Sequence, residues 1–189
     1  MNKKHIITIA GGIGSGKSST ADMVAKELGY KRFSSGDFMR QVAVDMNMSL
    51  NELSTKAESD ASIDAKIDAQ VKKAGEMNEV VIDSRLAFHW IPESFKVYLK
   101  LPPEISKSRI LNNLKENPLR RQSEESLTEE EIYEKITHRL ESEKKRFKEL
   151  YGVDHTNQNN FNIVIDTNEN NLEQVVKEII SYISSSVSD

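Results

Sequence analysis

The glycine-rich segment GGIGSGKS at residues 11–18 constrains the fold of this chain more than any other feature. It follows the apolar run HIITIA at 5–10, which is typical of a buried β-strand, and precedes a segment at 17–28 with apolar residues at helical spacing. Glycines at such a junction let the backbone turn its N–H groups inward, and the following helix adds the positive end of its dipole. The chain is therefore predicted to contain a strand–loop–helix unit that holds an anion.

This segment matches the phosphate-binding pattern G-x-x-x-x-G-K-[S/T], the Walker A motif. Lys17 is predicted to be catalytic, because its charge neutralises phosphate, and Ser18 is predicted to bind Mg²⁺. A plain flexible turn is the alternative, and the strand before and the helix after the loop argue against it. Lys17 also occupies the last position of G-x-G-x-x-G, which excludes the dinucleotide pattern. The residues predicted to bind ATP are Gly11, Gly12, Ile13, Gly14, Ser15, Gly16, Lys17, Ser18 and Ser19.

Short β-branched runs alternate with helical patterns along the rest of the chain. Further strands are predicted at 31–34, 79–83, 96–101 and 161–166. Continuous apolar runs separated by helices indicate parallel strands that are buried on both faces. The predicted fold is a single α/β domain over residues 1–189, a three-layer P-loop NTPase fold whose five-stranded parallel sheet is flanked by helices.

Composition excludes several classes of protein. A chain of 189 residues with 37% hydrophobic content suits one packed domain. It has no cysteine, which excludes disulfides, thiolate metal sites and a cysteine nucleophile. A net charge of -4 argues against general nucleic-acid binding, and the apolar runs are too short to span a bilayer. We expect a cytoplasmic monomer that binds small molecules, with neither nucleic acid nor a membrane as partner.

Two long segments interrupt the alternation of strands and helices. Residues 38–78 carry three short helical patterns, and a very polar stretch from residue 115 leads into a long charged helix. Long insertions in α/β domains are usually lids or binding segments. We therefore expect an acceptor-binding insert at about 38–78 and a lid at about 115–128, with a core formed by residues 1–37, 79–114 and 129–183.

The motifs of other P-loop classes do not occur. A GTPase needs D-x-x-G after its third strand and N/T-K-x-D after a later one, whereas the third strand here ends in DSRL and no N-K-x-D occurs. An oligomeric ATPase is normally longer and carries a second module. A small P-loop domain with two inserts suits a kinase that acts on a small metabolite.

Three further segments resemble those of the cytidylate kinases, above all the short archaeal-type ones. They are FSSGDFMR (33–40), VIDSRLAFHW (81–90) and RLESEKKRFKELYGVD (139–154), while IDAKIDAQ (63–70) resembles that family's second insert. The resembling segments occur in the same order as in the family, and the resemblance extends from residue 6 to about residue 167. It implies a P-loop nucleoside monophosphate kinase that phosphorylates CMP or dCMP with ATP and Mg²⁺.

The segment SSGDFMR is predicted to bind the acceptor's phosphate. It places Ser35, Asp37 and Arg40 at a strand end and in the following helix, and the fork of an arginine matches phosphate oxygens. The resemblance implies the same role and adds Arg85 as a contact of the acceptor nucleotide. The alternative is that Ser35 or Asp37 caps the helix and that Arg40 is solvated.

Asp83 is a second predicted ligand of Mg²⁺. It lies at the carboxyl end of the third predicted strand, which is beside the glycine loop in a parallel sheet of this type. A carboxylate there can hold the ion through water. The alternative is that Asp83 caps the helix that follows.

Arg139 and Arg146 are predicted to be catalytic. They are seven residues apart and so share one face of a helix. Related kinases close such lid arginines over the transferring phosphoryl group. For these two residues, and for Arg120 and Arg121, the alternative is an exposed i,i+4 ion pair.

Asp64 and Asp68 are four residues apart and share a helix face in the first insert. We predict that Asp68 accepts a hydrogen bond from the cytosine amino group or the ribose. The alternative is that both are surface charges, paired with Lys66 or Lys72. The chain also departs from the family here, since the family is richer in arginine just after the second aspartate.

The predicted function is therefore ATP-dependent phosphorylation of CMP or dCMP. A kinase of another small acceptor, such as AMP, UMP or a cofactor precursor, is the runner-up. A nucleotide-sensing protein without turnover is the third hypothesis, and it is disfavoured because Lys17, Ser18 and the candidate arginines are all present.

Overall fold

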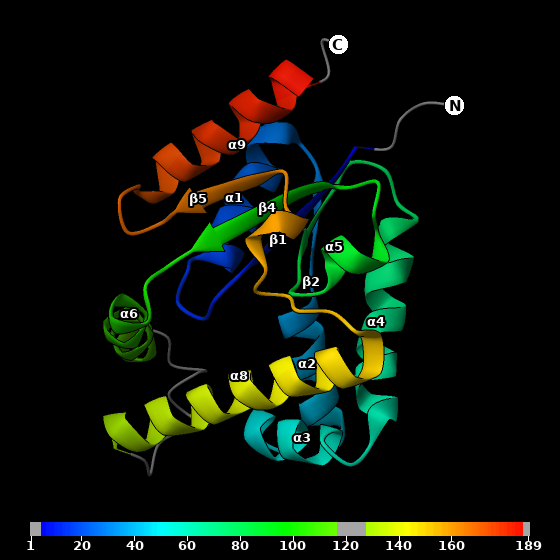
Figure 1. The fold of residues 1–189 in the computed structure, drawn as a ribbon, viewed down its shortest axis with the longest axis vertical. Coiled ribbons are helices and arrows are strands. Elements are labelled where there is room, and N and C mark those ends of the chain that lie inside the picture. Colours follow the sequence, from blue (N-terminus) through cyan, green and yellow to red (C-terminus); the bar gives the residue numbers. More distant parts are fainter. Residues whose placement is uncertain (1–4, 117–127, 187–189) are drawn as a thin grey trace.

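The computed structural model describes residues 5–116 and 128–186 and contains a five-stranded parallel sheet (Figure 1). Its strands run in the order β2-β3-β1-β4-β5, and every neighbouring pair is parallel. Their bounds are β1 (Ile6–Gly11), β2 (Lys31–Ser34), β3 (Val80–Asp83), β4 (Phe95–Lys100) and β5 (Ile163–Asp166). The predicted fold class is confirmed.

The register brings the carboxyl ends of the three strands β1, β2 and β3 together. Asp83 at the end of β3 pairs with Ile9 of β1 on one side and with Ser34 of β2 on the other. Gly11 at the end of β1 pairs with Leu99 of β4. The segments that leave these strands therefore start from one edge of the sheet, which is where ligands bind in open α/β sheets.

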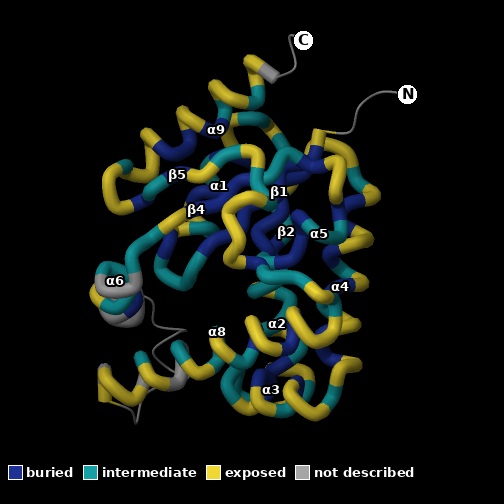
Figure 2. The backbone as a smooth tube through the Cα atoms, in the orientation of Figure 1, coloured by how far each residue is buried: buried dark blue, intermediate teal, exposed yellow. Residues whose placement is uncertain are grey.

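Helices cover both faces of the sheet, and each face has its own apolar core. Helices α1 (Lys17–Leu28) and α9 (Leu172–Ser186) pack on one face, while α4 (Ala61–Gly75) and α5 (Ala87–Trp90) pack on the other. Figure 2 shows the sheet and α1 as the most deeply buried part of the fold. Burial on both faces explains the continuous apolar runs in the strand sequences.

Between β2 and β3 the chain forms α2 (Ser35–Asp45), α3 (Leu50–Ala57) and α4, in agreement with the three predicted helices. These helices have a small apolar core of their own, formed by Ala43, Leu53, Ala57 and Ile63. A separate core makes this segment a packed substructure beside the sheet, and we call it the helical insert.

The long helix α8 (Glu129–Tyr151) lies across the open end of the fold, with α3 on one side and α6 (Pro103–Glu116) near its start (Figure 1). It begins at Thr128 with a capping box and ends at Gly152 in the left-handed conformation. A short 3₁₀ helix, η1 (Gln158–Asn160), leads from it toward β5. Most of the predicted lid, including Arg120 and Arg121, lies outside the described residues. Among the helices of the described part, none is long and apolar enough to span a membrane.

Candidate active site

Glycines shape the loop between β1 and α1, and at Gly11 and Gly16 any other residue would be strained. Gly11 has φ +151°, and a Cβ atom there would lie 2.4 Å from the carbonyl oxygen of Leu99. Gly16 caps α1 in the left-handed region, with φ 81°. The sequence GGIGSGKS therefore folds into a tight turn that leads straight into the N-terminus of α1.

Side chains hold the loop in this shape. The Lys17 ammonium and the Ser15 hydroxyl each donate to the carbonyl of Gly12 at 2.8 Å. From α6, the Ser106 hydroxyl donates to the carbonyl of Ile13 at 2.6 Å. The loop is thus braced from its own sequence and from a helix far along the chain, with Lys17 at its mouth and Ser19 exposed in the first turn of α1.

Asp83 lies beside the start of α1, as its position in the sequence predicted. Its Oδ2 accepts a hydrogen bond from Ser18 Oγ at 2.8 Å and one from Ser34 Oγ at 3.4 Å, and Arg32 Nη2 is 3.6 Å away. Asp83 is buried. The helix after β3 begins at Leu86 without a side-chain cap, so the alternative role of Asp83 as a helix cap is wrong.

A hydroxyl and a carboxylate in contact are oxygen ligands of the kind that Mg²⁺ prefers, so Ser18 and Asp83 fit this ion. In the described ranges, no group of three or more His, Asp or Glu residues is arranged to bind a metal. Any ion held by these two residues therefore needs further oxygens from a bound phosphate or from water.

Ser35, Asp37 and Arg40 lie at the start of α2, next to the carboxyl end of β3. Ser35 Oγ donates to the carbonyl of Asp83 at 3.3 Å. The N-cap of α2 is Ser34, so the alternative that Ser35 or Asp37 is the cap is wrong. Arg40 pairs with Asp37, which also accepts from Arg32 at 3.0 Å. Partial burial works in the opposite direction, but these two guanidinium groups hold the pKa of Asp37 below its usual value.

Arg85 and Arg139 meet at one buried carboxylate. Arg85 Nη1 pairs with Glu143 Oε2, and Arg139 Nε lies 3.9 Å from the other oxygen of Glu143. Glu143 belongs to α8 and is almost fully buried on the side of this helix that faces the sheet and the helical insert. The structure therefore brings a predicted acceptor residue from the β3–α5 turn next to a predicted catalytic residue of α8.

Arg146 is engaged in a buried ion pair with the helical insert. Its Nε donates to Asp64 Oδ2 at 2.9 Å, and its Nη1 donates to Ser142 Oγ at 2.7 Å. Both Arg146 and Asp64 are buried. The exposed i,i+4 ion pair that was the alternative for Arg146 is wrong, and the catalytic role remains a prediction.

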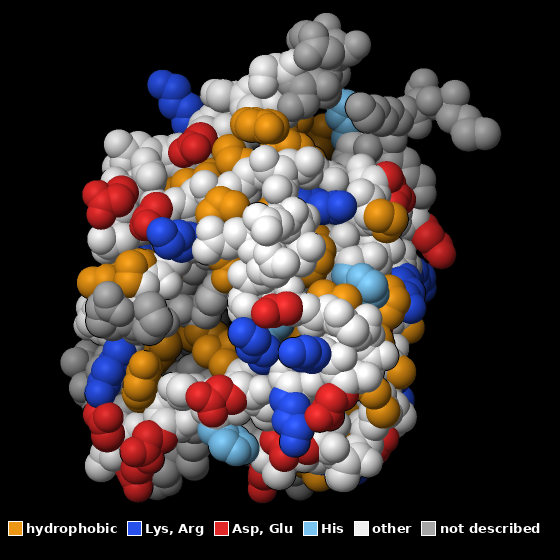
Figure 3. All heavy atoms as spheres, in the orientation of Figure 1, with side chains coloured by type: hydrophobic (Ala, Val, Ile, Leu, Met, Phe, Trp, Pro, Cys, Tyr) orange, Lys and Arg blue, Asp and Glu red, His pale blue; other side chains and the backbone are white. Residues whose placement is uncertain are grey.

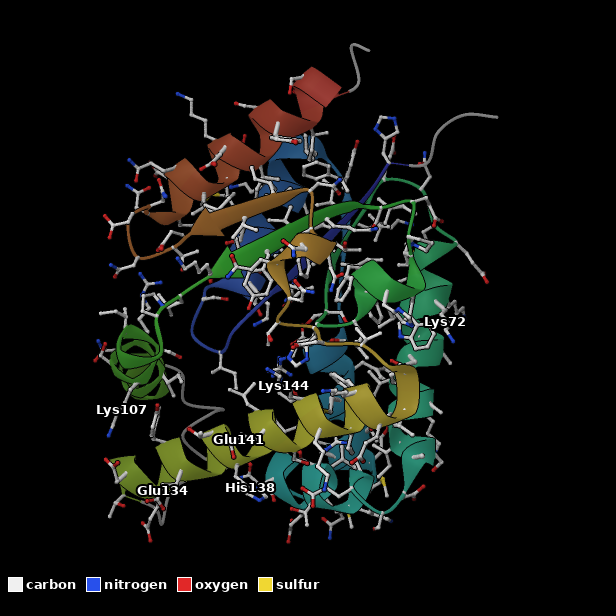
Figure 4. All side chains as sticks on the ribbon, viewed as in Figure 1. Lys72, Lys107, Glu134, His138, Glu141 and Lys144 are labelled. Carbon is white, nitrogen blue, oxygen red and sulfur yellow. The ribbon has the colours of Figure 1, made fainter. Side chains whose placement is uncertain are left out.

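Asp68 is also buried, so the alternative in which Asp64 and Asp68 are surface charges is wrong. Asp68 Oδ2 accepts from Tyr151 Oη at 2.6 Å, and its Oδ1 accepts from Trp90 Nε1 at 3.0 Å. Burial raises the pKa of Asp68 despite these two hydrogen bonds. The ammonium nitrogen of Lys72, which is labelled in Figure 4, lies 3.7 Å from the centre of the Trp90 ring. The hydrogen bonds to the Asp68 carboxylate come from Tyr151 and Trp90.

Two cavities flank α8. One of about 320 Å³ lies between α3 and α8, and the other, of about 170 Å³, lies between α8 and the glycine loop. Charged side chains gather over α8 on the face that Figure 3 shows. In Figure 4, Glu134 and His138 mark the α3 side of the helix, and Glu141 and Lys144 mark the side of the glycine loop. Arg139 lines the larger cavity and Arg85 the smaller one.

Several residues of this region were missed by sequence reasoning. Arg32 precedes the segment that resembles the family and has no motif of its own. Glu143 offers a weak signal, because it is four residues after Arg139 on the same helix face. Tyr151 and His155 follow at the end of α8 and just beyond it, where only the folded chain shows what they contact.

Comparison with known proteins gives consistent matches. A model of the cytidylate kinase-like family matches residues 6–169. A cytidylate kinase of Methanosphaera stadtmanae is 30% identical over 175 residues, which cover 92% of this chain and 95% of that protein. An S-adenosylmethionine-dependent nucleotide dehydratase of Lacinutrix mariniflava is 30% identical over 181 residues, 95% of this chain but 36% of that protein. The solved shikimate kinase of Acinetobacter baumannii shares the fold, with a TM-score of 0.63 at 16% identity over 97% of this chain and 94% of that one.

Proposed function

The chain belongs to the cytidylate kinase-like family, and we propose on this basis that it transfers the γ-phosphoryl group of ATP to CMP or dCMP. An oxygen of the acceptor's phosphate attacks the γ-phosphorus, the bond from that phosphorus to the β–γ bridging oxygen breaks, and ADP leaves. The acceptor phosphate is already ionised, so the reaction needs positioning and charge neutralisation rather than a strong base.

The observation that carries the proposal is the contact of Ser18 with Asp83 at the mouth of a braced glycine loop. On the donor side, Gly11–Ser19 would surround the phosphates of ATP, and Lys17 would neutralise charge on the transferring group. Ser18 and Asp83 would hold Mg²⁺, which supplies further positive charge next to the phosphates when it is bound.

On the acceptor side, the proposal assigns the phosphate of the nucleotide to Ser35, Arg40 and Arg85. Ser35 lies within hydrogen-bonding distance of the Asp83 carbonyl, so the start of α2 is held next to the proposed Mg²⁺ site. Asp37 would orient Arg40, with which it already pairs. Arg139 and Arg146 would act on the transferring group once their carboxylate partners are displaced or realigned.

The test is an ADP-release assay with a panel of nucleoside monophosphates. We expect CMP and dCMP to exceed AMP by at least about a hundredfold in kcat/KM, because two base-edge mismatches at about 1–3 kcal/mol each suffice for this ratio. If Asp68 reads the cytosine amino group, Asp68→Ala lowers this preference more than it lowers the rate with a poor acceptor.

Two results would contradict the proposal. AMP or UMP as the best acceptor would leave a P-loop kinase of a different specificity. Turnover of none of the monophosphates, with ATP binding intact, would favour the nucleotide-sensing alternative.

A further inference from the structure

Arg32 of β2 contacts three carboxylates that belong to three different elements. Its Nε lies 3.1 Å from Asp22 Oδ1 of α1, its Nη1 donates to Asp37 Oδ2 of α2 at 3.0 Å, and its Nη2 lies 3.6 Å from Asp83 Oδ2 of β3. The side chain of Arg32 is 23% exposed, so these contacts are partly shielded from water. One guanidinium group therefore links α1, α2 and β3.

Two of these carboxylates lie on opposite sides of the proposed reaction. Asp83 accepts a hydrogen bond from Ser18 at the proposed Mg²⁺ site. Asp37 pairs with Arg40, which is assigned to the phosphate of the acceptor. Arg32 is thus placed in contact with both the metal side and the acceptor side of the site.

At Asp37, Arg32 shares one carboxylate with Arg40. Arg32 contacts Oδ2 of this carboxylate and Arg40 contacts Oδ1, so each guanidinium group is opposed by only part of its charge. Without Arg32, the whole negative charge of Asp37 would be left to Arg40 and would oppose an anionic ligand there. Arg32 therefore keeps Arg40 attractive to a phosphate.

At Asp83 the charge of Arg32 acts in the opposite sense. A guanidinium group 3.6 Å from Oδ2 attracts this carboxylate but repels a divalent cation beside it. The distance is too long for a hydrogen bond, whereas Ser18 donates to the same oxygen at 2.8 Å. Arg32 therefore offsets part of the charge of Asp83 without engaging it in a hydrogen bond.

We propose that Arg32 is a positioning residue for phosphoryl transfer, which balances charge between the Mg²⁺ ligand Asp83 and the acceptor-binding pair of Asp37 and Arg40. It acts through these carboxylates rather than by contact with a reacting atom. The inference rests on the proposed function, because it takes Asp83 to hold Mg²⁺ and Arg40 to bind the acceptor's phosphate. Loss of Arg32 should weaken the binding of the acceptor and strengthen the effect of Mg²⁺, whereas damage to the fold would weaken both.

The test compares Arg32→Met with Lys31→Met by calorimetric titration with CMP, and with ATP in the presence and absence of Mg²⁺. Lys31 is the exposed neighbour of Arg32 on β2, and successive side chains of a strand point to opposite faces, so this control removes the same charge from the other face. For Arg32→Met we expect the Kd of CMP to rise about three- to fivefold, the upper end of what a partly exposed ion pair contributes. The factor by which Mg²⁺ lowers the Kd of ATP should increase by a similar ratio, and Lys31→Met should change neither quantity.

Asp22→Asn is a second variant that does not disturb the core, because the side chain of Asp22 is 62% exposed. It frees Arg32 from one competing carboxylate, so it should lower the Kd of CMP and reduce the effect of Mg²⁺. The inference alone is overturned if the wild type behaves as proposed but Arg32→Met changes neither quantity or weakens both, or if Asp22→Asn shifts neither. If the wild type does not bind CMP, or if Mg²⁺ does not tighten its binding of ATP, the proposed function is overturned together with the inference.

Discussion

The glycine loop and the underside of α8 both carry candidate site residues, but they are held together in different ways. In the loop, Gly12 is bonded by Ser15 and Lys17, which are 3 and 5 residues away. Beneath α8, the partners Arg85–Glu143, Asp64–Arg146 and Asp68–Tyr151 are 58, 82 and 83 residues apart. One region is organised mainly by its own sequence, and the other only by the complete fold.

The difference bears on how each region responds to a ligand. The loop offers backbone N–H groups and one lysine in a shape that glycines fix beforehand. The arginines of α8 are instead paired with buried carboxylates, so a phosphate must compete with Glu143 or Asp64 for them. For the proposed function, this difference implies a donor site that is preformed and an acceptor site whose arginines exchange ion-pair partners when the nucleotide binds.

The largest effect expected from this comparison is on stability, at Arg146. Arg146→Ala removes one partner of a buried pair and leaves the Asp64 carboxylate uncompensated, which costs about 3–5 kcal/mol of the free energy of unfolding. Urea denaturation at pH 7 measures this loss. The double variant Asp64→Leu/Arg146→Met should recover most of it, because apolar residues of similar size replace both charges.

Arg139→Ala is the matched comparison, because Arg139 is on the same helix and less deeply buried than Arg146. It should lower kcat far more than it changes the Kd of ATP, with little loss of stability.

A loss below about 1 kcal/mol for Arg146→Ala would show that the pair with Asp64 is dispensable for the fold. An unchanged kcat in Arg139→Ala would remove this residue from the catalytic set.

The loop should show the opposite behaviour, with loss of activity and no loss of stability. Lys17→Met removes the charge predicted to act on the transferring phosphoryl group, and we expect kcat to fall by about a hundred- to a thousandfold, or about 3–4 kcal/mol. The folded protein should unfold at the same urea concentration as the wild type. Lys26→Met, at an exposed position of the same helix, is the control. A variant that kept more than about a tenth of the activity would contradict the catalytic role of the loop.

A smaller effect concerns the pH dependence of stability, and it arises from His155 in the loop after α8. Because burial lowers the pKa of His155 from 6.5 to about 4 on folding, the unfolded chain binds its proton more readily than the native one does between these values. The free energy of unfolding therefore has its full value above pH 6.5 and falls by up to about 3 kcal/mol as the pH falls to 4. His155→Phe has no imidazole to protonate and does not show this loss. Its free energy of unfolding should therefore rise relative to that of the wild type as the pH falls over the same interval. Parallel curves for the two proteins would mean that His155 titrates normally in the native state.

The contrast between the regions also explains what the sequence can predict. The glycine pattern, the strand before it and the helix after it are local, and so the parallel sheet, the loop and the position of Asp83 follow from short segments. The strand bounds shift by one or two residues because the ends of apolar runs do not mark where pairing stops. The three helices of the helical insert were visible from their spacing alone.

Side-chain partners across the fold were not predictable in this way. The spacing of Asp64 and Asp68 showed that they share a helix face, but not that α8 covers this face and buries both. The same lack of long-range information hid Glu143 between two arginines and Tyr151 beside Asp68. The charge pairs between α4, α8 and the β3–α5 turn could therefore be identified only from the structure.

The smallest expected effect separates packing from base recognition at Asp68. Tyr151→Phe deletes one of the two hydrogen bonds to this buried carboxylate and should cost about 1–2 kcal/mol of unfolding free energy, with Tyr182→Phe at an exposed position as control. Trp90 is the single tryptophan of the chain, and it donates to the same carboxylate, so its fluorescence reports any movement. Tyr151 lines neither of the two cavities beside α8, and we therefore expect the ratio of kcat/KM for CMP and AMP to stay within about twofold of the wild type. If that ratio fell instead, Asp68 and Tyr151 would belong to the surface that recognises the base. Loss of a purely structural hydrogen bond would change kcat/KM for CMP and for AMP by the same factor.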